Sequence, residues 1–200
     1  MPCQTATCIL AVAFLALQAV SGEEVTAEDC MAPDFKHEVY LFTDFGKYHE
    51  LAMGIRSTGG EKPLFAHGVS SVMGLSANRN RDHFMCLWSP DSRFVAIFER
   101  ETKRTGVTNL YFASGDKVQE VAFPDLMPRI RPYLQTETRA FWVRPEVWLP
   151  QHQLLLSVDV IQNDEDLPAF RFIVTMQLPD PQARHFAGRI VFFQQDKSVK

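Results

Sequence analysis

The chain has 200 residues, 46% of them hydrophobic, which suits one domain with a substantial core. Its formal net charge is −4 at pH 7, with acidic and basic residues interspersed along the chain. The chain therefore has no excess of basic residues that would bind nucleic acid or an anionic membrane surface, and the sequence predicts neither partner.

The N-terminus has the layout of a secretory signal peptide. Residues 8–20 are almost all apolar, small residues follow, and the acidic pair Glu23-Glu24 comes next. The apolar run is shorter than the roughly 20 residues of a membrane-spanning helix, which favours cleavage after Ala19 or Gly22 over an uncleaved anchor. We assign residues 1–22 to a signal peptide and residues 23–200 to a single β-rich domain. The expected location is secreted or periplasmic, although the N-terminus lacks Lys and Arg and a buried N-terminal helix is the alternative.

The mature chain of 178 residues (200 − 22) keeps two of the four cysteines, Cys30 and Cys86. An even pair in an oxidising compartment predicts a disulfide. The alternative is a buried free Cys86 and an exposed Cys30.

The first half of the mature chain alternates apolar and polar residues with the period of a β-strand. Residues 37–45 and 48–57 predict a hairpin, and the glycine-containing stretch 58–82 predicts a loop with at most a short element. Residues 84–123 predict four strands with short connections, which is an antiparallel meander. Within it, both faces of Phe94–Glu99 are largely apolar, so this strand is expected to be central and covered on both sides.

The second half predicts a short helical crossover followed by another meander. Residues 124–139 carry apolar residues at helical spacing but also Pro128 and Pro132, so a turn or short helix is expected, with a better helix possible from Arg131 to Thr138. Pro145 predicts an edge position or a bulge in its strand. The four predicted strands are 140–149, 153–162, 169–178 and 187–195.

One segment resembles a known family. Trp88-Ser89-Pro90-Asp91, followed by a strand with the small residue Ala96 and then by Leu110-Tyr111, is similar to one blade of the TolB-like β-propeller repeats. The resemblance covers residues 84–123, and Ser92 stands where glycine usually follows the Asp. It implies a blade-like meander and no particular activity, and the chain is too short for a complete propeller of about four blades.

Sequence patterns for catalysis are weak. Ser114-Gly115-Asp116-Lys117 fits Ser-x-x-Lys, but Gly-Asp predicts a hairpin turn instead of the required helix start. The six histidines lack metal-ligand spacing, and residues 163–166 lack the pattern of a calcium loop. Carboxylates that could pair in a glycan hydrolase are Asp82, Asp91, Glu99, Glu101, Glu146 and Asp159.

Arginines near aromatic residues predict a binding surface, because this mixture is typical of interface hot spots. Its candidate residues are Arg129, Arg131, Tyr133, Arg139, Trp142, Arg144 and Trp148. The alternative is that the aromatic rings belong to the core and the arginines are solvated. The loop 58–82 is a second candidate surface, equally compatible with a plain connection.

Together these patterns predict an exported, non-enzymatic binding protein that acts through a protein–protein surface and needs no cofactor. Its expected partner is another envelope or secreted protein, and an inhibitor, an immunity-type protein or a bacterial envelope accessory factor would all fit. The alternatives are an envelope hydrolase that acts on glycans or another cell-surface polymer, and a self-associating structural subunit.

Overall fold

A computed structural model of the chain describes residues 25–44, 50–68, 84–164, 166–181 and 186–197. These residues form twelve strands and one short helical crossover, so the predicted mostly β fold with two four-stranded meanders is confirmed. The predicted signal peptide and most of the candidate loop 58–82 lie outside the described residues.

The N-terminal sheet is an antiparallel meander in the order β1-β2-β3-β4. It contains the predicted hairpin, and a short fourth strand occupies part of the predicted loop. Its strands are β1 (Val25–Met31), β2 (His37–Asp44), β3 (Glu50–Ser57) and β4 (Phe65–Gly68).

The second sheet has eight strands and joins the two predicted meanders. The first meander comprises β5 (Phe84–Trp88), β6 (Phe94–Glu99), β7 (Thr105–Ser114) and β8 (Lys117–Glu120). The second comprises β9 (Thr138–Leu149), β10 (Gln153–Gln162), β11 (Phe170–Gln177) and β12 (Arg189–Asp196).

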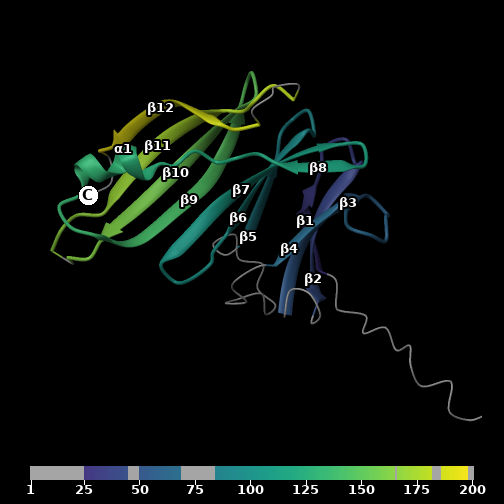
Figure 1. The fold of residues 1–200 in the computed structure, drawn as a ribbon, viewed down its shortest axis with the longest axis horizontal. Coiled ribbons are helices and arrows are strands. Elements are labelled where there is room, and N and C mark those ends of the chain that lie inside the picture. The colour runs from purple at the N-terminus through teal and green to yellow at the C-terminus, as the bar shows by residue number, and fades with distance from the viewer. Residues whose placement is uncertain (1–24, 45–49, 69–83, 165, 182–185, 198–200) are drawn as a thin grey trace, which may run out of the picture.

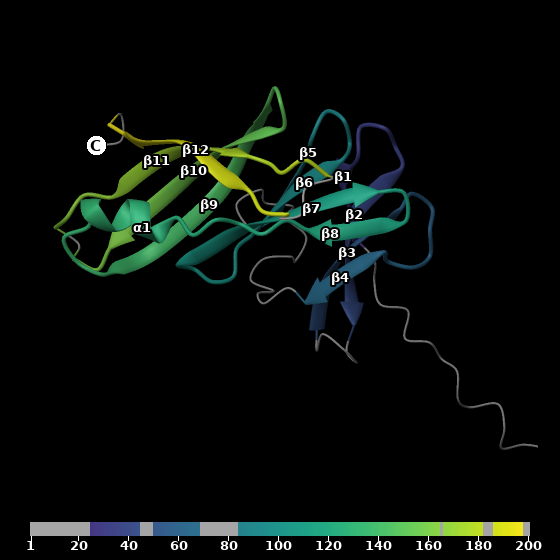
Figure 2. The same cartoon turned by 45° about the horizontal axis from the view of Figure 1, so that its top comes forward.

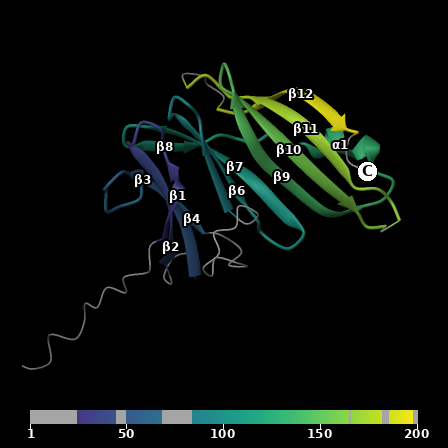
Figure 3. The same cartoon turned by 180° about the vertical axis from the view of Figure 1, so that it is seen from behind.

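The long strand β7 connects these meanders (Figures 1 and 3). Its beginning pairs in parallel with β9 at Thr105 and Gly106, and its end pairs antiparallel with β8. A side chain at Gly106 would collide with Phe98 and Trp142, since a Cβ there would lie 2.7 and 2.9 Å from them. Glycine therefore permits the close approach that joins the two meanders.

Strand β6 is an interior strand covered on both faces, as its apolar pattern predicted. All six of its residues are buried. Phe94 and Ala96 belong to a core shared with β9–β12, whereas Val95 and Ile97 belong to a core shared with the N-terminal sheet. Two cores thus meet on opposite faces of one strand.

The predicted disulfide between Cys30 and Cys86 is present and joins β1 to β5, with 5.3 Å between the two Cα atoms. Trp88 lies beside it in the same core and donates from Nε1 to the carbonyl of Cys30 at 3.0 Å. The tryptophan of the blade-like segment therefore fills space between two packed sheets, and its polar atom is satisfied.

The expected turn or short helix forms the crossover, but the longer helix that the sequence allowed from Arg131 to Thr138 does not form. An α-helical turn, α1 (Met127–Ile130), is followed by the 3-10 turn η1 (Arg131–Tyr133), each with proline near its start, and then by extended chain. The buried Gln162 accounts for the extension, because its Oε1 accepts hydrogen bonds from the backbone N–H groups of Gln135 at 2.7 Å and Thr136 at 3.2 Å.

Pro145 coincides with a bulge, one of its two predicted settings. It pairs with Leu156, whereas Val147 pairs with the adjacent Leu155, so Glu146 is the extra residue. Pro145 also lies beyond the two β9 residues that pair with β7, so its missing N–H interrupts no pairing there.

Candidate functional site

The blade-like segment forms a rigid turn between β5 and β6. Ser89 Oγ donates to Asp91 Oδ1 at 2.6 Å and accepts from the backbone N–H of Phe94 at 2.9 Å. The backbone N–H of Arg93 also donates to Asp91 Oδ1, at 3.2 Å. The next residue after the Asp, Ser92, has a left-handed backbone with φ of 59°. The serine and aspartate of the motif thus satisfy the turn's own backbone.

A second copy of this turn joins β1 to β2. Ala32-Pro33-Asp34-Phe35-Lys36-His37 repeats the backbone hydrogen bonds of Ser89-Pro90-Asp91-Ser92-Arg93-Phe94, although Ala32 lacks the hydroxyl through which Ser89 bonds to Asp91 and Phe94. In both, the first residue's N–H donates to the carbonyl of the sixth at 2.8 Å, and the Asp accepts from the backbone two residues on. Sequence reasoning missed this repeat, although Pro-Asp followed by a basic residue two positions later was a visible signal.

The two turns are docked on each other, because the N–H of Asp34 donates to Ser92 Oγ at 2.9 Å. In the turn between β1 and β2, Phe35 takes the left-handed position, with φ of 59°, and its side chain is 72% exposed. A bulky residue in this backbone region is a genuine outlier, and glycine is the usual choice. Phe35 is therefore disfavoured both by its backbone and by its exposure.

A third strained turn, between β9 and β10, lies against the turn between β5 and β6. Gln151 and His152 have φ of 62° and 56°, a pair of values that Asn-Gly or Gly-Gly normally supplies. Gln177 Nε2 donates to the carbonyl of Gln151 at 2.7 Å, which helps hold this backbone. His152 Nδ1 lies 3.5 Å from Asp91 Oδ2, and its ring packs near that of Phe94, with centroids 5.7 Å apart.

These three turns gather all four non-glycine residues with positive φ found in the described part of the chain: Phe35, Ser92, Gln151 and His152. We call residues 32–37, 89–93 and 150–153 the turn surface; it runs along the upper edge of Figure 1 and can be followed in Figure 2. Each left-handed residue costs on the order of 1–3 kcal/mol, and such strain concentrates at binding and catalytic sites. The turn surface is therefore the candidate functional site.

A hollow of about 410 Å³ opens on the turn surface between the two meanders. Arg93 forms one wall, and His152, Gln177 and residues 178–181 form the others. The Arg93 guanidinium carbon lies 5.3 Å from the centroid of the Phe112 ring, a cation–π contact that limits its freedom.

The structure separates the seven arginine and aromatic residues predicted to form one surface. Arg129 lies on α1, while Arg131 and Tyr133 lie on η1, with the Tyr133 ring against Phe172 at 5.1 Å. Trp148 belongs to the core and donates from Nε1 to the carbonyl of Leu87 at 3.0 Å.

The other three residues, Arg139, Trp142 and Arg144, lie on β9. The register places Trp142, Asp159, Arg171 and Asp196 in one row across β9, β10, β11 and β12. Asp159 accepts from Arg144 at 3.1 Å and from Arg171 at 2.6 Å, and the second bond raises the pKa of Arg171. Sequence alone did not find Arg171, because a cross-strand partner depends on register.

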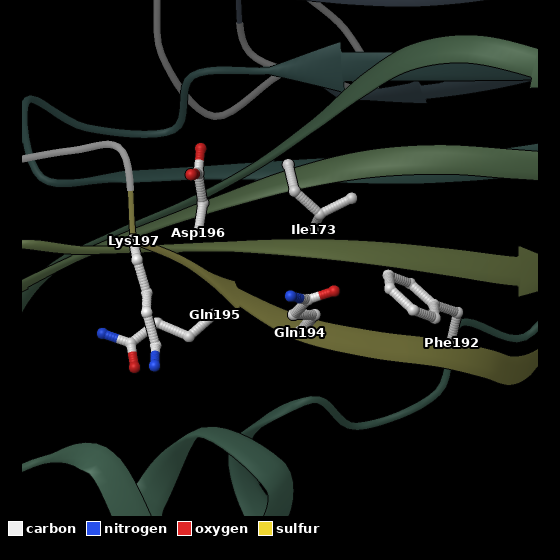
Figure 4. Close-up of a pocket in the computed structure, with 6 residues that line it drawn as sticks. All are labelled: Ile173, Phe192, Gln194, Gln195, Asp196 and Lys197. Atoms are coloured by element: carbon white, nitrogen blue, oxygen red, sulfur yellow. The ribbon is translucent and has the colours of Figure 1, made fainter.

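A shallow hollow of about 290 Å³ lies beside this row at the sheet edge. Ile173, Phe192 and Gln194 lie side by side along β11 and β12 (Figure 4). Val191 and Phe192 are 43% and 46% exposed, and β12 is the last strand of the sheet. This edge carries apolar side chains but no strained backbone.

A partly buried polar network connects β4, β6 and β7. His67 Nε2 lies 2.9 Å from Glu99 Oε1, and the Tyr111 hydroxyl lies 3.0 Å from His67 Nδ1. The hydrogen bond to Glu99 raises the pKa of His67, and burial raises the pKa of Tyr111. The order Tyr-His-Glu is that of a catalytic relay, but Tyr111 is 2% exposed and lines neither hollow, so the network links the sheets.

Four of the six candidate hydrolase carboxylates have structural partners. Glu146 accepts from Ser157, Asp159 from two arginines and Asp91 from its own turn, while Glu99 pairs with His67. Asp82 lies outside the described residues. Within the described ranges, no three His, Cys, Asp or Glu side chains are grouped as metal ligands.

Across the same described ranges, no helix has both the length and the apolar character needed to cross a bilayer. No known protein family, curated protein or solved structure matches this chain.

Proposed function

We propose that this protein is an exported binding protein that captures another secreted or envelope protein through its turn surface, with Phe35 as the apolar anchor. The observation that carries the proposal is the exposed, left-handed Phe35 on a turn that hydrogen bonds hold rigid. Glycine would fit this backbone better, so the phenyl ring is retained at a net cost to stability.

A rigid exposed ring suits a protein partner. Interface energies concentrate in a few aromatic and arginine side chains that enter pockets, and a fixed ring loses little conformational entropy on binding. Phe35 is flanked by Asp34 and Lys36, which lie 3.7 Å apart and offset each other's charge. The tip therefore has no basic excess to attract it to anionic lipids.

The disulfide between Cys30 and Cys86 is consistent with an extracellular location, because such bonds persist in oxidising compartments. It lies directly behind the turn surface, since β1 and β5 each lead into one of the two matching turns. It would keep the two turns in register outside the cell.

The test is site-specific photo-crosslinking in an envelope extract of the protein's own host. A benzophenone side chain replaces Phe35, and the matched control carries it at Lys103, in the exposed turn at the other end of β6. We expect one discrete adduct from position 35 that excess unlabelled wild-type protein competes away and the Phe35→Gly variant does not.

Two results would overturn the proposal. One is the absence of an adduct at position 35, or the same set of adducts from both positions. The other is equal competition by wild type and Phe35→Gly, which would show that the ring contributes nothing to capture.

The exposed edge of β12 favours a second candidate, self-association. Unpaired edge strands bind other strands, and Val191 and Phe192 leave this edge apolar. Phe192→Lys should then convert a dimer or larger assembly to a monomer in light scattering. A wild-type protein that is monomeric at 100-fold dilution and at high concentration alike would exclude this candidate.

A further inference from the structure

We propose that the hollow beside Arg93 and His152 binds a carboxylate group. Arg93 is exposed, and among the described residues its guanidinium contacts the Phe112 ring but no carboxylate or other acceptor. A guanidinium presents five N–H donors in a planar fork that matches a carboxylate with two parallel hydrogen bonds. This charge is held at the mouth of a preformed concave site.

The comparison with the matching turn explains why Arg93 lacks a partner. There Lys36 lies 3.7 Å from Asp34, two residues earlier. The corresponding Asp91 already accepts from Ser89 and from the Arg93 backbone, and its second oxygen faces His152 at 3.5 Å. The carboxylate that could have neutralised Arg93 is thus committed to the turn.

The surrounding charges favour a monoanion over phosphate. Asp91 lies behind His152, and Asp180 lines the hollow with a partner of its own, so two protein carboxylates lie near the Arg93 guanidinium. Their repulsion grows with each negative charge on the ligand, so a dianion such as phosphate is opposed more strongly than a monoanion. Pro179 and Pro181 stiffen the opposite wall, so the site is largely formed before binding.

This inference rests on the proposed function, because the carboxylate is taken to belong to the captured partner. It can come from an Asp or Glu side chain or from the partner's free carboxyl terminus. Both sources offer the same planar monoanion to Arg93, and the experiment separates them.

The experiment follows the Arg93 side-chain N–H resonance by NMR in the full mature protein. The probes are sodium acetate, a blocked peptide with a central Glu, its Gln counterpart, the Gln peptide with a free carboxyl terminus, and inorganic phosphate. We expect saturable shifts with acetate, with the Glu peptide or the free terminus, and at least ten-fold weaker shifts with the blocked Gln peptide and phosphate. The peptide whose shifts saturate at the lower concentration identifies the source of the carboxylate.

Arg93→Gln should abolish saturation of the remaining turn-surface resonances, including the His152 ring, whereas Lys103→Gln, in the exposed turn at the other end of β6, should leave it unchanged. Thermal melts check that both variants fold. The assignment is wrong if acetate gives no saturable shift, if Lys103→Gln weakens binding as much as Arg93→Gln, or if phosphate binds more tightly. If position 35 still crosslinks its partner in such a case, the proposed function stands without this site. If carboxylates bind at Arg93 but position 35 gives no adduct, the carboxylate site stands and the proposed function is wrong.

Discussion

The strand β6 and the turn that precedes it differ sharply, although they adjoin in sequence. All six residues of β6 are buried and belong to regular pairing on both sides. The turn immediately before it contains the left-handed Ser92 and contacts the two other strained turns. Stability is therefore concentrated in the strand and strain in the turns. The contrast indicates that the β framework supplies the stability that holds the turn surface in an unfavourable backbone.

Loss of the disulfide should have the largest effect on the framework. The double change Cys30→Ala and Cys86→Ala opens a loop of 56 residues. We expect it to lower the free energy of unfolding by about 4 kcal/mol, because the unfolded chain regains loop entropy. Urea unfolding of the oxidised wild type and the variant measures this, with reduced wild type as the control. A loss below about 1 kcal/mol would mean that the framework does not depend on this link.

Truncation within β6 should come next. Ile97 is completely buried in the core shared with the N-terminal sheet. Ile97→Ala should destabilise the protein by about 3 kcal/mol, through lost transfer free energy and a residual cavity. Urea midpoints measure the loss, and Lys103→Ala in the exposed turn after β6 serves as a control that should change stability by less than about 0.5 kcal/mol. Equal effects would contradict the central role of β6.

The His67 network should make the framework sensitive to pH. Because the folded pKa of His67 lies above its usual value, its stabilisation is fully present below the unfolded pKa near 6.5 and is lost as pH rises through the folded pKa. His67→Gln should cost about 2 kcal/mol at pH 5.5 and less at pH 8.5, since it leaves the buried Glu99 poorly paired. Urea unfolding at both pH values measures this, and a loss that grows with pH would contradict the assignment.

The smallest effect has the opposite sign. Phe35→Gly should stabilise the protein by about 1 kcal/mol, because glycine accepts the left-handed backbone and the exposed ring contributes little packing. The thermal midpoint should rise by a few degrees. A matched Lys36→Gly change, which follows Phe35 and has no positive φ, should destabilise or leave stability unchanged. A destabilised Phe35→Gly would show that the turn is not strained.

The candidate site was less predictable than the fold. Strand positions followed from the period-2 pattern, so β10 and the four strands of residues 84–123 lie where they were predicted. The seven-residue arginine and aromatic surface was divided between the core, the crossover and β9, because sequence proximity does not fix which face a residue occupies. The sequence did not identify His152 and Phe35 as site residues, because strain is a property of backbone angles and their residue types do not predict a positive φ.

Local chemistry determined the strands, the turn at Ser89–Arg93 and the pairing of Cys30 with Cys86. Alternation, proline and aspartate act over a few residues, and only two cysteines lie outside the predicted signal peptide. Tertiary structure alone decided that the segment after Tyr133 is extended, because Gln162 on a distant strand binds its backbone. It also decided that three separate turns meet. The hydrogen bond from Asp34 to Ser92 joins residues 58 positions apart in the sequence. The contact between Asp91 and His152 depends on the pairing of β9 with β10. Neither contact could be predicted from neighbouring residues in the sequence.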